Sequence, residues 1–449
     1  MRDSPGSVGG RSTRREYLLG VGAAAGLAGC LDLPASGVSY DLDESSFDPP
    51  ALPYDETYPD DGVTMFRGGL RRLGYYPGET VPESVAAEWE RPINFRCHNA
   101  AKSSPLVAPD GETILIPADT GKMHAVTPGG DHQWTTETPA TRQGFHATPV
   151  IADGVAYLGA YDGANIGQDA AMYAFDVETG ERLWRTEEMH GSVAIGSSAG
   201  YWDGYLFVVV EHRHPTRKGE LWVFEAESGR PVFSDDRIVD MPHPTVAISP
   251  LHERLLTGSN DGKVYCWEFP SLEFAWDFET DREVKGPIAV YEGGAFVGSW
   301  DSNLYRLDVE DGSEEWSFET GSVVMSAPAI DPDAGIVYFG SDDQHVYALD
   351  ADSGEEQWAT DVNGRVMGAL TVTDDVILAG TTAAEVVALE KDTGEMRWFF
   401  DCRGQATSAP VPYDGDIYFA ERAMLSGCWS EDDEETVEMP GHAYCLSSR

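Results

Sequence analysis

A ten-residue pattern recurs along this chain of 449 residues. In "LDADSGEEQW", an apolar strand end leads into an acidic turn with a glycine, and Trp358 follows four residues after that glycine. Close or looser copies of the pattern end at six further positions: Trp134, Trp184, Phe233, Trp276, Trp316 and Trp398. Neighbouring copies are 40 to 50 residues apart. A repeat of about 40–45 residues is typical of the four-stranded blade of a β-propeller.

One repeat, from Val324 to Trp358, predicts four strands. "VMSAPAI" is small and apolar, as expected of a strand near a central axis, and "GIVYFGS" and "HVYALD" alternate as pleated strands do. "DDQ" and "ADSGE" supply turn residues, and "EQWAT" is a fourth strand anchored by its tryptophan. No segment after the N-terminal region has a convincing helical period, so an all-β fold is predicted. An array of β-sandwiches is the alternative, but it does not require a self-similar unit of this length.

The number of blades follows from the number of first strands. These are expected to begin at eight positions: Ser103, Ala147, Gly196, Thr245, Gly286, Ser326, Gly368 and Ser408. The last unit ends after its third strand, whereas "AAEWERP", which contains Trp89, precedes the first unit. We therefore predict an eight-bladed β-propeller of four-stranded blades, in which this N-terminal strand closes the eighth blade. Such closure pairs the strand edges that an open ring would expose.

The chain is strongly acidic, with 77 acidic residues against 30 basic ones and a formal charge of −47. This charge argues against nucleic acid as a partner, because phosphates would be repelled. An excess spread along the whole chain resembles that of halophilic proteins, in which high salt screens the self-repulsion. The charge is therefore interpreted as an adaptation to the environment more than as a binding code.

The N-terminal region resembles a targeting segment. In "STRREYLLGVGAAAGLAGC", Arg14 and Arg15 precede an apolar run, as in twin-arginine export signals, although tyrosine and leucine replace the commoner residues after the pair. "LAGC" resembles a lipobox, which would place a lipid on Cys30 and hold the exported protein on the outer face of the cell membrane. An uncleaved signal anchor is the alternative. The expected division is an export signal at 1–29, a flexible tether at 30–62, a lead-in at 63–84 and the propeller at 85–449.

Five cysteines follow Cys30. Cys266 and Cys445 occupy the same slot of a third strand and are expected to be small buried hydrophobic residues. The remaining three lie in connections expected on one face of the ring, where an exported protein can form a disulfide. One bridge is therefore predicted among Cys97, Cys402 and Cys428, and the sequence does not choose the pair.

The unit "VYALDADSGEEQW" closely resembles the repeat of the pyrroloquinoline-quinone (PQQ)-like propellers, and the resemblance covers about residues 85–449. "MFRGGLRRLGYYPGE" resembles the lead-in that often precedes such propellers. The resemblance implies one of two functional classes. One contains quinone-dependent alcohol and sugar dehydrogenases, and the other contains cofactor-free binding propellers such as the lipoprotein of the bacterial outer-membrane β-barrel assembly machine. A shared fold does not decide between them.

The dehydrogenases of this family typically hold the quinone against an adjacent Cys-Cys disulfide and bind Ca²⁺ beside a catalytic aspartate. This chain contains no Cys-Cys pair, and no residue set aligns with the calcium site. The aspartates that recur in hairpin turns are interpreted as structural: Asp119, Asp162, Asp261, Asp301 and Asp342. No catalytic residue, metal ligand or cofactor is therefore predicted, and PQQ and calcium belong only to the dehydrogenase alternative. The histidines of "HRH" (His212–His214) are expected to lie in a loop.

A ligand site is predicted where the connections into the first strands approach the axis. Basic residues gather there despite the acidic composition, and the candidates are Lys102, His146, His243 and Lys285. Neighbouring connections add further cations: Arg96, His98, His190, Arg365 and Arg403. Together they predict a cationic mouth for an anionic ligand or an acidic peptide tail. The alternative is that these cations merely offset aspartates on the same face.

The sequence thus predicts an exported, lipid-anchored propeller that binds unidentified protein partners at the cell envelope without catalysis. A PQQ-dependent dehydrogenase and a sensing module for a small extracellular ligand are the alternatives.

Overall fold

The computed structural model describes residues 62–95, 103–138, 144–161, 171–186, 193–212, 217–423 and 439–449. The chain divides into two units, Met1–Tyr40 and Asp41–Arg449, and every described residue belongs to the second. The predicted export arginines Arg14 and Arg15, and the predicted lipid site Cys30, lie outside the described residues. In the described part of the chain, no helix is long and apolar enough to cross a membrane.

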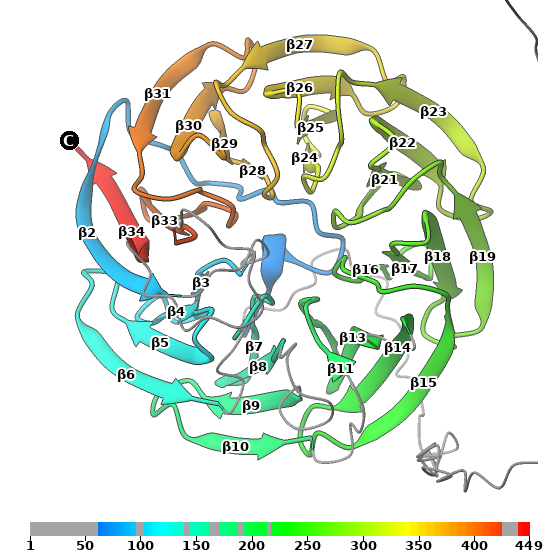
Figure 1. Ribbon diagram of the computed structural model, residues 1–449, viewed down its shortest axis with the longest axis horizontal. Coiled ribbons are helices and arrows are strands. Elements are labelled where there is room, and N and C mark those ends of the chain that lie inside the picture. The colour runs from blue at the N-terminus through cyan, green and yellow to red at the C-terminus, as the bar shows by residue number, and fades with distance from the viewer. Residues whose placement is uncertain are drawn as a thin grey trace, which may run out of the picture. The chain divides into compact units, whose positions relative to one another are not determined.

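Eight antiparallel sheets stand around a common centre, as Figure 1 shows. The all-β, eight-bladed propeller is therefore confirmed. The first blade contains β3 (Leu106–Val107), β4 (Ile114–Pro117), β5 (Lys122–Val126) and β6 (His132–Glu137). The second contains β7 (Val150–Ala152), β8 (Val155–Gly159), β9 (Met172–Asp176) and β10 (Arg182–Arg185). The third contains β11 (Val193–Ala194), β12 (Gly200–Trp202), β13 (Tyr205–His212), β14 (Lys218–Glu225) and β15 (Pro231–Ile238). The fourth contains β16 (Ala247–Ser249), β17 (Arg254–Gly258), β18 (Lys263–Glu268) and β19 (Phe274–Glu279).

The second half of the ring repeats this plan. The fifth blade contains β20 (Ala289–Tyr291), β21 (Gly294–Gly298), β22 (Asn303–Asp308) and β23 (Glu314–Glu319). The sixth contains β24 (Ala329–Asp331), β25 (Ile336–Gly340), β26 (His345–Asp350) and β27 (Glu356–Asp361). The seventh contains β28 (Thr371–Val372), β29 (Val376–Gly380), β30 (Glu385–Glu390) and β31 (Met396–Asp401). The eighth contains β32 (Val411–Tyr413), β33 (Asp416–Ala420), β34 (Gly441–Ser448) and β2 (Val85–Asn94).

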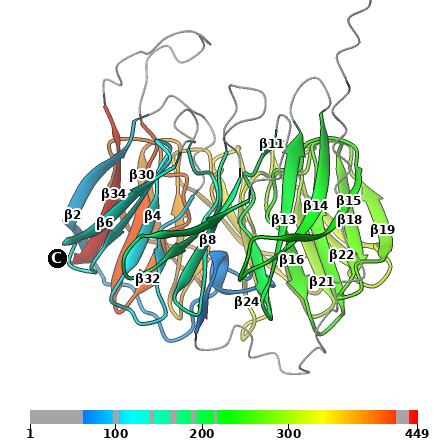
Figure 2. The ribbon, with the colours of Figure 1, turned by 90° about the horizontal axis from the view of Figure 1, so that it is seen from below.

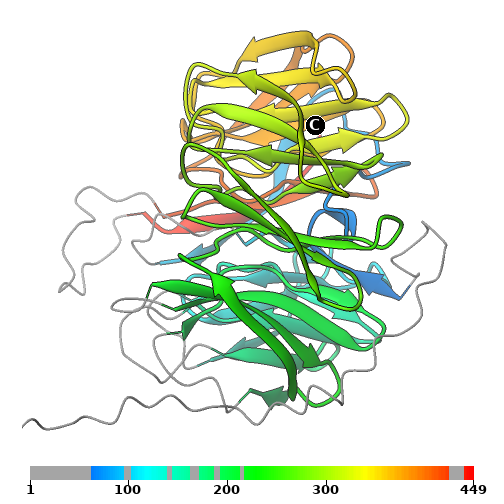
Figure 3. The same cartoon turned by 90° about the vertical axis from the view of Figure 1, so that its right-hand side faces the viewer.

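The core lies between neighbouring blades. The middle strands of the sixth blade, β25 and β26, are buried along almost their whole length, whereas the outer strand β27 alternates between exposed and half-buried residues. Phe296 of the fifth blade and Phe339 of the sixth belong to one buried cluster. The side views in Figures 2 and 3 show the sheets standing next to one another around the ring. Each blade therefore covers an apolar face of its neighbour, which a single sheet could not bury alone.

The predicted closing strand is confirmed. β2 pairs antiparallel with β34 along its length, and Trp89 lies opposite Cys445. The blade that contains the C-terminal strands thus obtains its outer strand from residues about 350 positions earlier in the chain. This pairing covers the edge that β34 would otherwise expose.

The recurring glycine and tryptophan meet across the blade junctions. A Cβ atom on Gly394 of the seventh blade would lie 2.6 Å from Cε3 of Trp358 of the sixth, so only glycine leaves room for the indole there. Gly394 also has a φ of +71°, which glycine adopts without strain. The indole Nε1 of Trp358 donates a 3.0 Å hydrogen bond to the carbonyl of Lys391 in the same turn. The repeat is therefore a link between one blade and the next.

Five further indoles donate in the same way to the turn of the following blade, and the donors are Trp89, Trp134, Trp184, Trp276 and Trp316. Trp398 donates to the carbonyl of Pro82, in the segment that leads into β2. At the junction of the third and fourth blades, Phe233 stands at the tryptophan position. There the indole of Trp267 donates back across the junction to Asp235, at 2.9 Å.

The lead-in follows the inner edges of the blades, as its blue ribbon in Figure 1 shows. β1 (Val63–Thr64) pairs with β7, and a short 3₁₀ turn, η2 (Phe66–Gly68), follows. The backbone carbonyls that come next accept hydrogen bonds from inner strands of four blades: Leu70 from Ile248, Arg71 from Val290, Leu73 from Ile330 and Gly74 from Val372. The lead-in thus pairs with first strands that would otherwise present unpaired groups to the axis.

Two arginines of the lead-in are buried among backbone carbonyls. Arg72 donates to the carbonyls of Val246, Ala199 and Phe66, at 2.8–3.0 Å. Arg67 donates to the carbonyl of Leu370 at 2.9 Å and also to that of Pro328. Phe66 packs beside them against small residues at the beginning of inner strands: Ala327, Ala369 and Ala409. These contacts join the lead-in to blades on several sides of the ring.

Candidate functional site

The two faces of the ring carry different connections. Because each sheet is antiparallel, the turns between first and second strands and between third and fourth strands lie on one face, here called the turn face. The turns between second and third strands and the connections between blades lie on the other, here called the connection face. The candidate mouth belongs to the connection face. Of its residues, His146, His243 and Lys285 are described, whereas Lys102 is not.

A buried carboxylate brings two of the predicted residues into one network. Glu211 is fully buried at the end of β13, and its Oε1 lies 2.8 Å from Nδ1 of His243. Its other oxygen accepts a hydrogen bond of 3.3 Å from the hydroxyl of Tyr161. The ring of Tyr161 stacks on His146 with 3.9 Å between ring centres. The network therefore joins residues from connections and strand ends of consecutive blades.

Lys285 lies on an aromatic surface. Its Nζ is 3.6 Å from the ring centre of Trp300, close enough for a cation–π contact. Burial lowers the pKa of the Lys285 amine, and nearby Glu283 acts in the opposite direction. The amine is half-buried, so an anion that approached it would meet a partly dehydrated cation.

The neighbouring cations that are described also have partners within the chain. Arg365 lies 3.5 Å from Asp342, as expected if these cations offset aspartates on the same face. Arg403 pairs with Glu90. Arg96, His98 and His190 lie outside the described residues. A ligand at the mouth would have to compete with these internal contacts. The cationic mouth stays a prediction.

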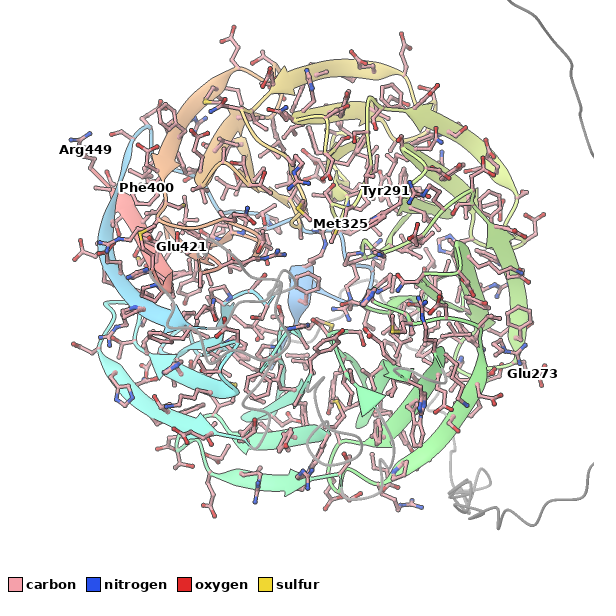
Figure 4. The ribbon with its side chains drawn as sticks, viewed as in Figure 1. Glu273, Tyr291, Met325, Phe400, Glu421 and Arg449 are labelled. Atoms are coloured by element: carbon pink, nitrogen blue, oxygen red, sulfur yellow. The ribbon has the colours of Figure 1, made fainter. Side chains whose placement is uncertain are left out.

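Sequence reasoning missed a second buried carboxylate, Glu421, which Figure 4 labels at the eighth blade. Its Oε2 accepts hydrogen bonds from the backbone N–H groups of Arg403 and Gly404, at 2.9 and 2.7 Å. Its Oε1 accepts from the backbone N–H of His442 at 3.0 Å and from the hydroxyl of Tyr444 at 3.2 Å. Met325, labelled nearer the centre of the ring, lies in the connection between the fifth and sixth blades. Glu421 therefore ties the connection into the eighth blade to the strands behind it.

Both buried carboxylates had a signal in the sequence. Glu211 ends the apolar run "LFVVVE" and Glu421 ends "IYFAE". An acidic residue directly after a buried strand needs hydrogen-bond partners, because an unpaired buried charge is strongly unfavourable. That signal identifies a buried acid, but it does not identify the partner.

Two of the five hairpin aspartates, Asp261 and Asp301, have the structural role that was predicted. Asp261 accepts from the backbone N–H of Lys263 and from the hydroxyl of Tyr265, at 3.0 and 2.6 Å. Asp301 accepts in the same way from Asn303 and Tyr305. In the sixth blade this role belongs to Asp343, whereas Asp342 pairs with Arg365, because the turn is shifted by one residue.

The other two aspartates differ. Asp119 accepts a hydrogen bond of 2.9 Å from the backbone N–H of Phe95, at the end of the closing strand. Asp162 lies outside the described residues.

The described cysteines are free thiols. Cys266 and Cys445 are buried in equivalent positions, since each lies opposite the third residue of its second strand. Cys402 is partly buried and unbridged. Cys97 and Cys428 lie outside the described residues, so a bridge that involves these two stays a prediction.

The described residues do not fit the quinone and calcium site of the dehydrogenases. The sequence has no Cys-Cys pair to face a quinone. In the described ranges, no three His, Cys, Asp or Glu residues are placed to hold a metal ion. Two of the buried carboxylates of the connection face are already held, Glu211 by His243 and Glu421 by backbone N–H groups.

Comparison with curated proteins gives two relatives. The chain is 24% identical over 267 residues to the serine/threonine-protein kinase AfsK of Streptomyces coelicolor, covering 59% of this chain and 29% of that protein. It is 28% identical over 280 residues to outer membrane protein assembly factor BamB of Yersinia pestis, covering 58% of this chain and 62% of that protein. The chain thus spans less than two thirds of either relative.

Solved structures with the same fold include dehydrogenases and BamB. The quinohemoprotein alcohol dehydrogenase of Comamonas testosteroni has a TM-score of 0.67 at 13% identity, with 85% of this chain and 80% of that chain covered. A europium-containing methanol dehydrogenase has a TM-score of 0.68 at 11% identity, with 87% and 98% covered. BamB from Moraxella catarrhalis has a TM-score of 0.55 at 14% identity, with 82% and 98% covered. At these identities the likeness concerns the fold alone.

The family comparison is more extensive. One family profile, described as outer membrane protein assembly factor BamB, matches residues 78–249, 251–343 and 342–434. These matches include strands of all eight blades and the closing strand. The chain belongs to the family of outer membrane protein assembly factor BamB.

Proposed function

We propose that this protein is a non-catalytic propeller that binds other proteins at the cell envelope. The observation that carries the proposal is the family match, which extends from residue 78 to residue 434. The description of that family names an assembly factor, and such a factor acts through contacts with other proteins. The partners are proteins of the envelope whose identity the chain does not specify.

The geometry of the connection face supports this function. Its charged side chains are held by the chain itself, as in the pairs Glu211–His243 and Lys285–Trp300. Groups that are already oriented lose little side-chain entropy when a partner binds. Charges spread over several blades also suit a broad partner surface more than a single small molecule.

Capture of partners in native cells tests the proposal. A tagged full-length chain, crosslinked before extraction, should retain specific envelope proteins. The variant Lys285→Ala/Arg365→Ala should retain less of them, because both cations lie on the connection face. Arg182→Ala/Arg449→Ala is the matched control, since both arginines are exposed and Arg449 lies at the rim in Figure 4. Equal loss in the two variants would contradict an interaction through the connection face.

Export and lipid attachment form part of the same proposal. The lipobox-like "LAGC" would place the lipid on Cys30, so that the propeller sits on the outer face of the cell membrane. Cys30→Ser should release a folded propeller into the medium or leave it held by an uncleaved leader. If the variant loses its leader and still stays on membranes, a partner protein and not a lipid holds it there.

Binding of PQQ or of a small anion would assign the protein to another class. Protein incubated with PQQ and Ca²⁺ and then dialysed should retain neither the quinone absorbance nor stoichiometric calcium. Small carboxylates titrated against wild type and Lys102→Ala/Lys285→Ala test the cationic mouth. Equal binding by both proteins would contradict an anion site at these lysines.

A further inference from the structure

An open cleft separates the second and third blades on the turn face. It has a volume of about 580 Å³. Its lining comes from both blades and includes Tyr157, Leu183, Trp184, Tyr201, Ala226 and Glu227. No basic side chain of the described residues lines it. Its volume lies within the range of ligand-binding pockets, roughly 300–1,000 Å³.

One side of the cleft is an aromatic wall. The ring centre of Tyr157 lies 5.8 Å from that of Trp184 and 6.2 Å from that of Tyr201, and the two tyrosine rings are stacked. Burial raises the pKa of the Tyr157 hydroxyl, and the neighbouring Tyr201 and Asp153 raise it further. The wall is therefore uncharged at neutral pH, and its ring faces attract cations.

The rim of the cleft is acidic. Asp153, Asp203 and Glu227 are exposed carboxylates on turns of the two blades. The fourth acidic residue, Glu225, is already bound by Arg230 of its own turn. Acidic surfaces are common in a chain with a charge of −47, but the equivalent junctions of other blades show which groups meet such a rim.

The junction of the sixth and seventh blades has the same construction. Tyr338 pairs with Ala348 as Tyr157 pairs with Ala174, and the indole of Trp358 donates to Lys391 as that of Trp184 donates to Ala226. By the same register, Asp331 stands at the position of Ala152. The Nζ of Lys391 lies 2.7 Å from Oδ2 of this buried Asp331. The chain therefore places its own ammonium group at this junction.

A guanidinium occupies the junction of the fifth and sixth blades. Arg306 stands at the position of Ala174, and its side chain lies over Gly294, which stands at the position of Val155. Its Nη1 is 2.9 Å from Oδ1 of Asp352, which stands at the position of Glu227. The guanidinium carbon lies 5.8 Å from the ring centre of Phe296, at the position of Tyr157. A cation thus lies between an aromatic ring and the turn carboxylate.

At the junction of the fourth and fifth blades, an arginine from a different position forms the ion pair. Arg254, at the position of Val155, lies 2.7 Å from Glu310, at the position of Glu227. At these three junctions a basic side chain of the chain itself meets a carboxylate. The second and third blades have Val155, Ala174 and Ala226 at the corresponding positions, so no basic side chain enters the cleft from these positions.

The junction of the first and second blades has a turn carboxylate but lacks the aromatic wall. There Glu178 stands at the position of Glu227, and no basic residue stands at the positions of Arg254, Arg306 or Lys391. However, Leu115 replaces the aromatic residue of the wall. Among these five junctions, and in the described residues, only the one between the second and third blades combines an aromatic wall and a turn carboxylate with no basic residue at the positions of Arg254, Arg306 and Lys391.

We propose that the cleft between the second and third blades binds the guanidinium or ammonium group of a basic side chain from a partner protein. This inference rests on the proposed protein-binding function and names the chemistry that the partner presents. The methylene stem of such a side chain would lie along the exposed Leu183 and the half-buried Trp184 while its charge reaches the carboxylates of Asp153 and Glu227. The binding thus reproduces between two proteins the contact that Arg306 and Lys391 make within this one.

A short labelled peptide tests the site directly. The probe is a dye-labelled Gly-Ser-Arg-Ser-Gly peptide, and the comparison is the same peptide with citrulline, which is neutral and close to arginine in shape. Fluorescence anisotropy with the full chain should show binding of the arginine peptide at least about tenfold tighter than that of the citrulline peptide. The absence of this preference would overturn the proposal.

Two variants locate the binding. In Ala152→Asp/Ala226→Lys, the cleft receives the pair that Asp331 and Lys391 form elsewhere, so the chain's own amine should block the probe. In Asp153→Asn/Asp203→Asn/Glu227→Gln, the carboxylates are lost without a change of shape. Each variant should weaken binding of the arginine peptide at least about fivefold. If the first variant does not fold, the second decides the question.

The matched control removes the same charge at other turns. Glu178→Gln/Glu181→Gln/Glu273→Gln changes three exposed carboxylates and should alter the affinity less than about twofold. Equal weakening in the control and in the rim variant would mean general attraction to an acidic protein, and it would overturn the proposal.

The peptide measurement is independent of partner capture. Selective peptide binding without any captured envelope protein would contradict the proposed function and leave the cation site intact. Capture of a partner together with unselective peptide binding would contradict the cation site and leave the proposed function intact.

Discussion

The indole of Trp358 covers Gly394, and a Cβ atom on this glycine would lie 2.6 Å from Cε3 of the indole. The two residues belong to neighbouring blades, so the glycine serves packing between blades as well as its own turn. Similar contacts join Trp184 to Gly229 and Trp316 to Gly354. The stability of the ring should therefore depend on these glycines more than on other glycines with positive φ.

Gly394→Ala should destabilise the propeller more than Gly415→Ala. Both glycines have positive φ values, +71° and +82°, so alanine at either position costs about 1 kcal/mol in backbone strain. Only at Gly394 does the added methyl group meet an indole, which should add about 1–3 kcal/mol. Equilibrium unfolding in urea measures the difference. Equal free energies of unfolding in the two variants would mean that the Trp358 contact is not required.

Arg72→Met should destabilise the ring strongly, although it removes a buried charge. Burial, together with the neighbouring Arg67, lowers the pKa of Arg72 to about 9, so its guanidinium is still charged at neutral pH. Without it, the carbonyls of Val246 and Ala199 lose their donor, at a cost of about 1–3 kcal/mol for each buried group. Arg71→Met is the control, because Arg71 is partly exposed and contributes its backbone carbonyl. The free energies of unfolding of the two variants should differ by at least about 2 kcal/mol.

Stability should fall above about pH 10, the ordinary pKa of tyrosine. Burial, and then hydrogen bonds to Asp261, Asp301 and Asp343, raise the pKa values of Tyr265, Tyr305 and Tyr347 in the folded chain. Groups whose pKa is higher in the folded state contribute stability that is complete below the unfolded pKa and is lost as the pH rises through the folded pKa.

The triple variant Tyr265→Phe/Tyr305→Phe/Tyr347→Phe should therefore lose less stability than wild type between pH 9 and about pH 11. At pH 8 it should be less stable than wild type by about 1 kcal/mol for each lost hydrogen bond. The lowered pKa values of Arg67 and Arg72 act with the opposite sign, but they are common to both proteins. Identical slopes of unfolding free energy against pH would contradict the prediction.

Deletion of residues 84–93 should abolish folding. The deletion removes nearly all of β2, so β34 loses its partner strand and the eighth blade becomes an open edge. Circular dichroism and size-exclusion chromatography should show an unfolded or aggregated chain. A folded protein with a slightly lower melting temperature would show that β2 is not needed for closure.

Glu421→Gln should destabilise the eighth blade. An amide keeps the shape of the carboxylate, but its NH₂ group would face N–H donors from Arg403 and Gly404 or from His442. We expect a loss of about 2–4 kcal/mol in the free energy of unfolding, because charge-assisted hydrogen bonds are replaced by a repulsive contact. Glu395→Gln, on an exposed turn, should leave that free energy within about 0.5 kcal/mol of wild type.

The sequence by itself determined the ring. Turn glycines, strand alternation and the tryptophan four residues after each glycine are local features, and their period fixes the unit that must be repeated. The eighth unit lacks a fourth strand and Trp89 precedes the first unit, so closure by β2 was also predictable. In seven blades the expected beginning of the inner strand lies two or three residues before the observed one, because the small residues of each connection precede the strand itself. In the third blade the expected Gly196 lies between β11 and β12.

Only the tertiary structure decided which distant groups meet. Arg67 reaches the carbonyl of Leu370, more than 300 positions away, and Glu211 pairs with His243 of the next connection. Nothing local to these residues specifies such partners. The cleft between the second and third blades is also invisible in a single repeat, since it arises where Ala226 and Val155 replace residues that other junctions fill with Lys391 and Arg254. A repeat sets the positions in each blade, but the space between two blades depends on the side chains that both contribute.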